Sequence, residues 1–427
     1  MNDIKHLKCL SAVRSMAAVR QLRPAAYPGV HCPMHTALAL AANIRGVSTL
    51  LIGTAECGYY SRNVPLSSPY GEEALHWNYV LDSKEVVFGF RKGLMEAIRE
   101  MDQAGARLIL LLSTCVPELI GLDMESICLE MQPEVKSMLL HLPLGNFKCG
   151  GYEPGYWKTL LAMGKTIEKS ANKGMIVNVL GRSALEEHVP MPRVITYLKH
   201  QGVPLRFLAP DSSLDDFISS GDARLNLVLS PFMDSLAQWM AKEHDIPFVS
   251  LHDVYNVREI ESTYSQIGQY LDLEMAHEFA EQKKEGKRVQ KAAAAQLKAL
   301  QYISANLGTV QPLPLSAYLS DLGMSPIMIH MAEFYPSDTR WKEMLTGQDI
   351  NPIICLMLNE QADMQIIEEL RPDLVMGDWG GRSRNNPPSV PVLDLYGHIG
   401  YERTIDLLNR MTRALRIGKE ERANGTV

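Results

Sequence analysis

The sequence predicts an α/β protein built of parallel sheets flanked by helices. Three observations predict it: apolar runs without alternation, glycine-containing turns after them, and helix-like segments between them. A short apolar run with no polar alternation is typical of a strand buried on both faces, as in a parallel sheet. Because such strands alternate with helices along the chain, we expect βαβ units throughout.

The first block of the chain, residues 31–165, repeats a pattern of helix, strand and turn. Its predicted strands are 48–53 and 108–113, and its predicted helices are 33–45, 90–104 and 117–131. Pro117 and Glu118 suit the first turn of a helix, where backbone amides lack internal partners. Cys115 is therefore expected at the carboxyl end of a buried strand, where a helix begins.

Two further α/β blocks follow the first. The middle block has predicted strands at 174–181, 203–209, 225–231 and 246–251 and helices at 192–201 and 233–244. A segment rich in Ala, Lys and Glu, 274–307, predicts one long helix or two helices end to end. The last block has predicted strands at 326–334, 351–358, 373–378 and 390–395. It closes with an amphipathic helix whose apolar residues, from Leu407 to Leu415, recur at helical spacing.

The length of the chain predicts several domains. With 427 residues it is too long for one ordinary core, and its 46% hydrophobic and 21% charged residues are globular values. We expect an N-terminal α/β domain over 1–165 that carries the cysteines discussed below. A middle α/β domain over 166–307 ends in the long helix, and a C-terminal α/β domain covers 308–427.

The charge and hydropathy of the chain exclude several classes of partner. The net charge of −7, from 42 basic and 49 acidic residues, argues against a nucleic-acid partner. No apolar stretch approaches the roughly 18 residues that a membrane span requires. The first residues have scattered charges and no signal-peptide core. A cytoplasmic protein without a membrane or nucleic-acid partner is therefore expected.

The seven cysteines do not form a disulfide framework, because an odd number is spread over a long chain. Cys9, Cys128 and Cys355 are interpreted as small buried hydrophobes. Cys149, in the segment NFKCGGYEPGYW, is left open between a structural role and a role in a site.

Cys32, Cys57 and Cys115 each stand at a predicted helix start. A thiolate there feels the positive end of the helix dipole, and open α/β sheets bind ligands at the edge where strands end. The spacing of these cysteines matches no zinc-finger pattern. Thiolates are the usual ligands of iron–sulfur clusters, and Gly58 beside Cys57 lets the backbone approach a bulky cluster. Three thiols are one short of the four that a cubane needs, so another chain, a non-cysteine ligand or both would complete the cluster.

Phosphate-binding loops are missing from the sequence. It contains neither GxGxxG after a strand nor GxxxxGK[ST], so any ATP would be hydrolysed by another protein. The loop DWGGRSRNNPP at 378–388 is either a turn that needs glycine freedom or part of a binding cleft.

Four segments in order resemble component 1 of nitrogenase and its relatives. They are HCPMHTALAL (31–40), GTAECGYYSRN (53–63), DSKEVVFG (82–89) and STCVPELIGLD (113–123). The resemblance implies three Rossmann-like domains. It also implies that Cys32, Cys57 and Cys115 bind an iron–sulfur cluster shared between subunits, either a P-cluster-like [8Fe-7S] cluster or a [4Fe-4S] cluster.

The resemblance also implies partners and an activity. The partners are a homologous second subunit, in a hetero- or homo-oligomer such as a heterotetramer, and an ATP-hydrolysing iron–sulfur reductase protein. Residues 82–95 are expected to help form the docking surface for the latter. The expected activity is that of an oxidoreductase: the subunit relays electrons from the iron protein to a reducible substrate.

The sequence departs from catalytic nitrogenase subunits in the middle and last blocks. Leu229 or Ser230 stands where the resemblance places a cofactor-binding cysteine, and His398 lies a few residues late for the cofactor histidine. Two alternatives within the family are a scaffold for assembly of a nitrogenase-type metallocluster and a tetrapyrrole reductase subunit. An α/β protein with purely structural cysteines is a third, unrelated alternative.

Overall fold

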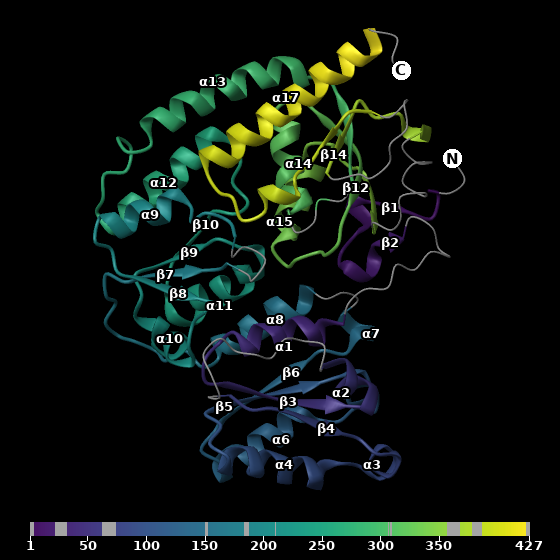
Figure 1. The fold of residues 1–427 in the computed structure, drawn as a ribbon, viewed down its shortest axis with the longest axis vertical. Coiled ribbons are helices and arrows are strands. Elements are labelled where there is room, and N and C mark those ends of the chain that lie inside the picture. The colour runs from purple at the N-terminus through teal and green to yellow at the C-terminus, as the bar shows by residue number, and fades with distance from the viewer. Residues whose placement is uncertain are drawn as a thin grey trace. The chain divides into compact units, whose positions relative to one another are not determined.

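Three sheets flanked by helices carry the fold (Figure 1). The computed structural model describes residues 4–21, 32–61, 74–149, 153–182, 188–209, 211–305, 307, 310–356, 368–377 and 387–423. The chain packs as two compact units: Met1–Gly29, Glu186–Gly202 and Val249–Val427 form one, and Val30–Leu185 and Val203–Phe248 form the other. The α/β fold with parallel sheets flanked by helices is confirmed, and the three domain ranges stay a prediction.

The first sheet, called here the cysteine sheet, has the strand order β4-β3-β5-β6, and all neighbours pair in parallel. Its strands are β3 (Val47–Gly53), β4 (His76–Val80), β5 (Leu108–Ser113) and β6 (Met138–Pro143). Its helices are α1 (Pro33–Ala42), α2 (Ala55–Ser61), α3 (Ser83–Phe88), α4 (Arg91–Gln103), α5 (Cys115–Leu119), α6 (Met124–Met131), α7 (Asn146–Cys149) and α8 (Glu153–Gly164).

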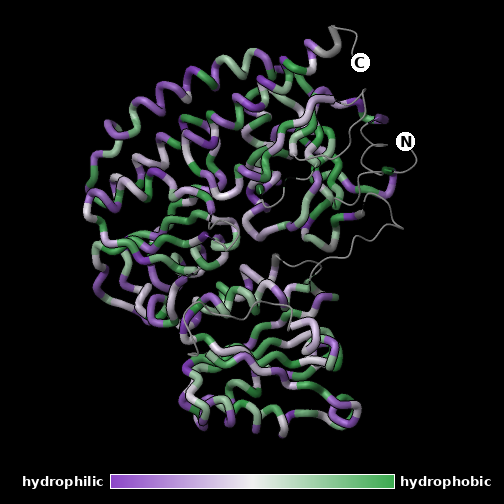
Figure 2. The backbone as a smooth tube through the Cα atoms, viewed as in Figure 1, coloured by the Kyte–Doolittle hydropathy of each residue, from purple (hydrophilic) through white to green (hydrophobic). Residues whose placement is uncertain are grey.

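The core of the cysteine sheet explains why the apolar runs become central strands. β3 and β5 are buried along their whole length. The apolar stripe of α4, formed by Leu94, Ile98 and Met101, packs against Ile109 and the rest of this core. Figure 2 shows the resulting contrast between hydrophobic strands and helices of mixed hydropathy.

The middle sheet has the strand order β10-β9-β7-β8, and β7 pairs in parallel with both of its neighbours. Its strands are β7 (Val177–Leu180), β8 (Leu205–Leu208), β9 (Leu225–Val228) and β10 (Phe248–Ser250). The helices of this part of the chain are α9 (Arg193–His200), α10 (Leu214–Ser219) and α11 (Asp234–His244).

The C-terminal sheet has the order β1-β13-β12-β11-β14-β15, and β2 also pairs with β13. Its strands are β1 (Lys8–Cys9), β2 (Arg20–Gln21), β11 (Gln301–Ser304), β12 (Ser325–His330), β13 (Ile353–Leu356), β14 (Leu374–Met376) and β15 (Ser389–Val390). Only the pairing of β1 with β13 is antiparallel among the described pairs of this sheet. The helices are α12 (Val257–Leu271), α13 (Ala280–Leu297), α14 (Pro312–Asp321), α15 (Asp338–Gly347) and α17 (Tyr401–Ala423).

Two predicted helices differ from the structure. The segment 117–131 is not one helix, because Gly121 has a φ of 74° and separates α5 from α6. The Asp123 side chain then caps α6 by accepting a hydrogen bond from the Ser126 amide at 2.9 Å. The predicted helix 274–307 includes α13 but ends at Leu297, and β11 follows.

Among the described residues, no helix has the length and hydrophobicity needed to cross a membrane.

Candidate metal centre

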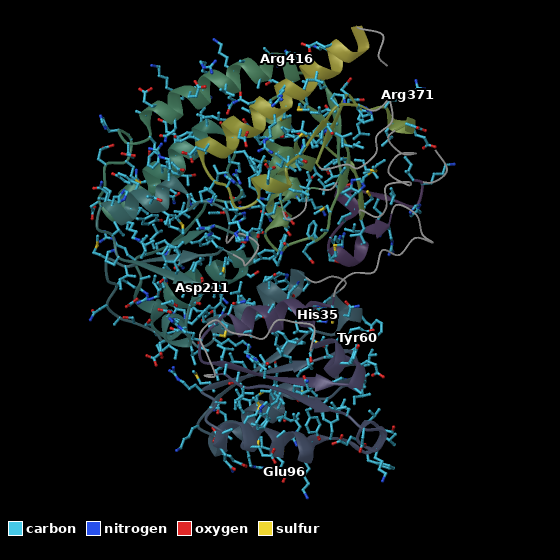
Figure 3. All side chains as sticks on the ribbon, in the orientation of Figure 1. His35, Tyr60, Glu96, Asp211, Arg371 and Arg416 are labelled. Atoms are coloured by element: carbon cyan, nitrogen blue, oxygen red, sulfur yellow. The ribbon has the colours of Figure 1, made fainter. Side chains whose placement is uncertain are left out.

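The three predicted cysteines lie where the strands of the cysteine sheet end. Cys57 is in α2, which follows β3, and Cys115 is the first residue of α5, which follows β5. Cys32 is the N-cap of α1. Because the strands are parallel and α1 leads back into β3, these positions share the carboxyl edge of one sheet. Figure 3 labels His35 on α1 and Tyr60 on α2, two helices in contact at this edge.

The turn that holds Cys57 is tightly packed against the end of β5. The Thr114 hydroxyl donates a hydrogen bond of 3.0 Å to the carbonyl of Ile52. A Cβ atom on Gly53 would lie 2.4 Å from Thr114 Oγ1 and 3.2 Å from Cys57 Sγ. The absence of a side chain at position 53 therefore lets the Cys57 sulfur and the Thr114 turn lie close together.

The Cys115 sulfur is held by the turn that follows β6. The backbone amide of Asn146 donates a hydrogen bond of 3.2 Å to Cys115 Sγ. Glu118, one helical turn after Cys115, accepts a hydrogen bond of 2.6 Å from the amide of Gly145. Glu118 therefore fixes the β6–α7 turn beside the thiol, a positional role that the sequence did not indicate.

Burial and neighbouring thiols both disfavour ionisation of the Cys32 thiol. Burial raises the pKa of the Cys32 thiol to about 11, although a backbone hydrogen bond involving Met34 opposes the rise. The charges of Cys115, Cys57 and Cys149 raise the same pKa further. Iron binding must therefore displace the proton of Cys32.

The donor set suits a cluster better than a single ion. In the described part of the chain, no three His, Cys, Asp or Glu side chains are arranged to hold one metal ion. Three thiols carried by elements at one sheet edge match an iron–sulfur cluster, in which each cysteine binds a different iron atom. The close Gly53 backbone and the Asn146 amide also suit sulfur ligands that approach the protein main chain.

The remaining sequence candidates have varied outcomes. The backbone amide of His398 donates to Leu395 in the turn before α17. Most of the loop 378–388 lies outside the described residues.

Cys355 and Cys128 fit structural roles, and Cys9 differs from them. Cys355 is buried in β13 with the apolar side chains of Ile303 and Val375. Cys128 is half-buried in α6 against the core of the cysteine sheet. Cys9 is exposed in the two-residue strand β1. The interpretation of Cys9 as a buried hydrophobe is therefore wrong, because its short strand leaves the thiol at the surface.

Replacing Gly53 by Ala is expected to displace Cys57 and destabilise the fold. The new methyl group would overlap the buried Thr114 hydroxyl, and such overpacking costs about 1–3 kcal/mol. We expect a lower midpoint in urea unfolding and a lower iron content per chain. Gly347→Ala is the control, since a Cβ there meets no atom within 4 Å. Equal iron content and stability in Gly53→Ala and the native chain would contradict the tight packing of this turn.

Comparisons with known proteins agree with the motifs. The family model of nitrogenase component 1 type oxidoreductases matches residues 32–416. In the solved structure titled "Nitrogenase Cp1 at pH 6.5" the similar chain is 18% identical, with a TM-score of 0.66 over 92% of this chain and 94% of that chain. At 18% sequence identity, this structural similarity shows only that the two chains share a fold.

Three curated relatives share one name, "Nitrogenase iron-molybdenum cofactor biosynthesis protein NifE". The protein from Clostridium pasteurianum is 27% identical over 53% of this chain and 50% of its own length. The protein from Methanosarcina barkeri is 25% identical over 55% and 53%, respectively. The chain thus spans about half the length of these two relatives. The protein from Rippkaea orientalis is 21% identical over 94% of this chain and 88% of its own.

The family model covers most of the chain, and the fold and the four motifs point the same way. The resemblance inferred from the motifs is therefore confirmed. The chain belongs to the nitrogenase component 1 type oxidoreductase family.

Proposed function

We propose that this chain is a subunit of the catalytic component of a nitrogenase-like reductase. It binds an iron–sulfur cluster through Cys32, Cys57 and Cys115 and relays electrons from an ATP-dependent iron protein to a reducible substrate. The observation that carries the proposal is the gathering of these three thiols at one edge of the cysteine sheet. A bound cluster supplies a reversible electron carrier, with a potential set by nearby hydrogen bonds and charges.

The residues around the thiols would each contribute to holding such a cluster in a different way. Three helix starts place the sulfurs, and the Gly53 backbone leaves space beside Cys57. The Asn146 amide donates to the Cys115 sulfur, and hydrogen bonds to ligand sulfurs raise the reduction potential of a cluster by stabilising its reduced, more negative state. The apolar core behind the strands limits the access of water from that side.

A homologous second subunit is part of the proposal, and the surface near the thiols supports it. Large apolar side chains are exposed on the helices that carry or flank the cysteines: Tyr59 and Tyr60 on α2, Leu119 on α5 and Phe147 on α7. Exposed apolar groups gathered around one site are typical of an interface. A partner subunit over this surface would exclude solvent from the cluster and share it.

The assembly scaffold is the second candidate, and the printed names of the three relatives favour it. A scaffold must hold the metallocluster that it builds. At the position where the family resemblance places a cofactor thiol, Leu229 and Ser230 are both buried and offer no cysteine. We therefore place the reductase first. A tetrapyrrole reductase subunit would be one form of it.

An anaerobic electron-transfer experiment separates these candidates. The chain is purified with its partner subunit and mixed with its iron protein, dithionite and ATP, while electron paramagnetic resonance follows the cluster. A reductase shows ATP-dependent reduction of a cluster that stays on the chain. A scaffold instead loses iron to an added metal-free acceptor protein and shows no turnover. Loss of iron without ATP-dependent reduction would overturn the reductase proposal.

A further inference from the structure

A groove lies between α13 and α17, two long helices that pack side by side against the core of the C-terminal sheet (Figure 1). Its volume is about 510 Å³, which lies in the range of sites for small molecules. We call it the α17 groove. It is lined by one residue of α13 and seven residues of α17: Gln296, Asn409, Thr412, Arg413, Leu415, Arg416, Lys419 and Glu420.

The groove has an apolar floor and polar walls. Leu415 is 9% exposed and belongs to the hydrophobic core beneath the two helices. Arg413, Arg416 and Lys419 follow one another at intervals of three residues along α17, and Figure 3 labels Arg416 on this helix. The rise of an α-helix places the first and the last of these cations about 9 Å apart along the helix axis.

Positive charge exceeds negative charge in the groove, although the whole chain has a net charge of −7. Three cations and one carboxylate, Glu420, line it. In the described part of the chain, the ion pairs of α17 from Arg410 onward involve Arg410 and Arg416 but neither Arg413 nor Lys419. Arg416 lies 3.9 Å from Glu420, and both side chains are mostly exposed, so this pair contributes little to stability.

Arg410 shows how α17 uses a cation for stability. One turn before Arg413, it donates hydrogen bonds to the carboxylates of Asp394 and Asp406 at 2.6–2.8 Å. The cations of the groove instead neighbour one another, and like charges one turn apart destabilise a helix. The helix dipole favours cations in the last turn, but Arg413 and Arg416 lie before that turn. Folding alone therefore does not account for this row of cations.

The side chains of the groove suit a ligand with several negative charges. A guanidinium group matches the two oxygens of a phosphate or a carboxylate, and an ammonium group adds a point charge. The amides of Gln296 and Asn409, on opposite walls, each contain a hydrogen-bond donor and an acceptor. The apolar floor at Leu415 suits an uncharged part of the same molecule.

We propose that the α17 groove binds a small organic polyanion with at least two phosphate or carboxylate groups. Arg413, Arg416 and Lys419 hold the anionic groups, and the amides of Gln296 and Asn409 orient the rest of the molecule. This site is separate from the cysteines and goes beyond the proposed function, because it needs neither a cluster nor a second subunit.

The test is isothermal titration calorimetry of the full chain with ADP, pyrophosphate and citrate. We expect dissociation constants below about 1 mM at low salt, and weaker binding at about 1 M salt, where charges are screened beyond about 3 Å. Arg413→Gln and Lys419→Gln should each weaken binding by about tenfold or more, because a charge-assisted hydrogen bond is lost. Binding of ADP and pyrophosphate without citrate identifies phosphate as the recognised group, and the reverse pattern identifies carboxylate.

Two further variants separate the site from general effects of charge and folding. Arg288→Gln removes an exposed arginine of α13 that pairs with Glu285 outside the groove, and it should bind as the native chain does. Glu420→Gln removes the one carboxylate that lines the groove and should tighten binding by about twofold to fivefold, a gain that misfolding does not produce.

Absence of binding heat with all three compounds would overturn the proposal. Native affinity in both Arg413→Gln and Lys419→Gln would overturn it as well, since the anion would then bind elsewhere. The iron content of the chain is a separate measurement, so the α17 groove and the proposed function can each fail without the other.

Discussion

Cys115→Ala is expected to remove nearly all of the bound iron from the chain. Cys115 lies at the end of the central strand β5, and its sulfur is fixed by the amide of Asn146. No other cysteine in the described part of the chain follows this strand directly, so the site offers no substitute ligand. The side chain is small and partly exposed, and alanine favours helices, so the fold should survive the change.

The measurement is iron and sulfide per chain after anaerobic purification, with circular dichroism as the check on folding. Cys355→Ala is the matched control, because Cys355 is buried in β13 of the C-terminal sheet among apolar side chains. It should keep the native iron content. If both variants lose iron to the same extent, the assignment of the ligands is wrong.

Phe88→Asp is expected to impair electron delivery without loss of the cluster. Phe88 ends α3 and is 85% exposed, and its neighbour Val87 is also exposed. Both lie in the 82–95 segment that the family resemblance predicts as the docking surface of the iron protein. Apolar side chains exposed in this way mark an interaction surface, and an aromatic anchor there contributes about 2 kcal/mol or more to binding. A buried aspartate would add the cost of desolvating a charge.

Stopped-flow kinetics of ATP-dependent reduction should therefore show an apparent affinity for the iron protein at least about tenfold weaker, since 1.4 kcal/mol corresponds to one factor of ten. Direct reduction by dithionite should be unchanged, because it does not use the docking surface. Met344→Asp replaces another exposed apolar residue, on α15, and is the control. Equal affinity in the native and Phe88→Asp proteins would remove α3 from the docking surface.

The strands with unbroken apolar runs were predictable from the sequence. The predicted strand 108–113 has the bounds of β5, and 48–53 differs from β3 by one residue. β4 and β6 were missed, because the segments His76–Val80 and Met138–Pro143 are partly exposed and interrupted by polar residues. Their place in the sheet depends on pairing with β3 and β5, a tertiary effect that a local pattern does not contain.

Helix ends were less predictable than strands. Gly121 is a local signal for the break between α5 and α6. The apolar residues on both sides of it nevertheless made the segment resemble one continuous helix. The end of α13 was missed for another reason. The residues Gln301–Ser304 directly follow a helix-forming stretch, but Tyr302 and Ile303 favour strands and are fully buried in a central strand between β12 and β14. The strand signal of four residues was lost beside the much longer helix signal before it.

The candidate site was only partly accessible from the sequence. The placement of Cys57 and Cys115 follows from one rule, because the carboxyl ends of parallel strands meet at one edge. Cys149 and Lys158 come together through the packing of α7 and α8, and no spacing in the sequence encodes their contact. The hydrogen bond from the Gly145 amide to the Glu118 carboxylate depends in the same way on strand β6, which was not predicted.

The central claim, that this chain binds an iron–sulfur cluster at the edge of the cysteine sheet, is tested most directly by metal analysis. The chain is purified anaerobically with its partner subunit, and iron, acid-labile sulfide and the Mössbauer spectrum are measured per chain. We expect about four irons and a matching amount of sulfide, with spectra typical of thiolate-bound iron. Fewer than about two irons per chain, or iron without sulfide, would contradict the claim.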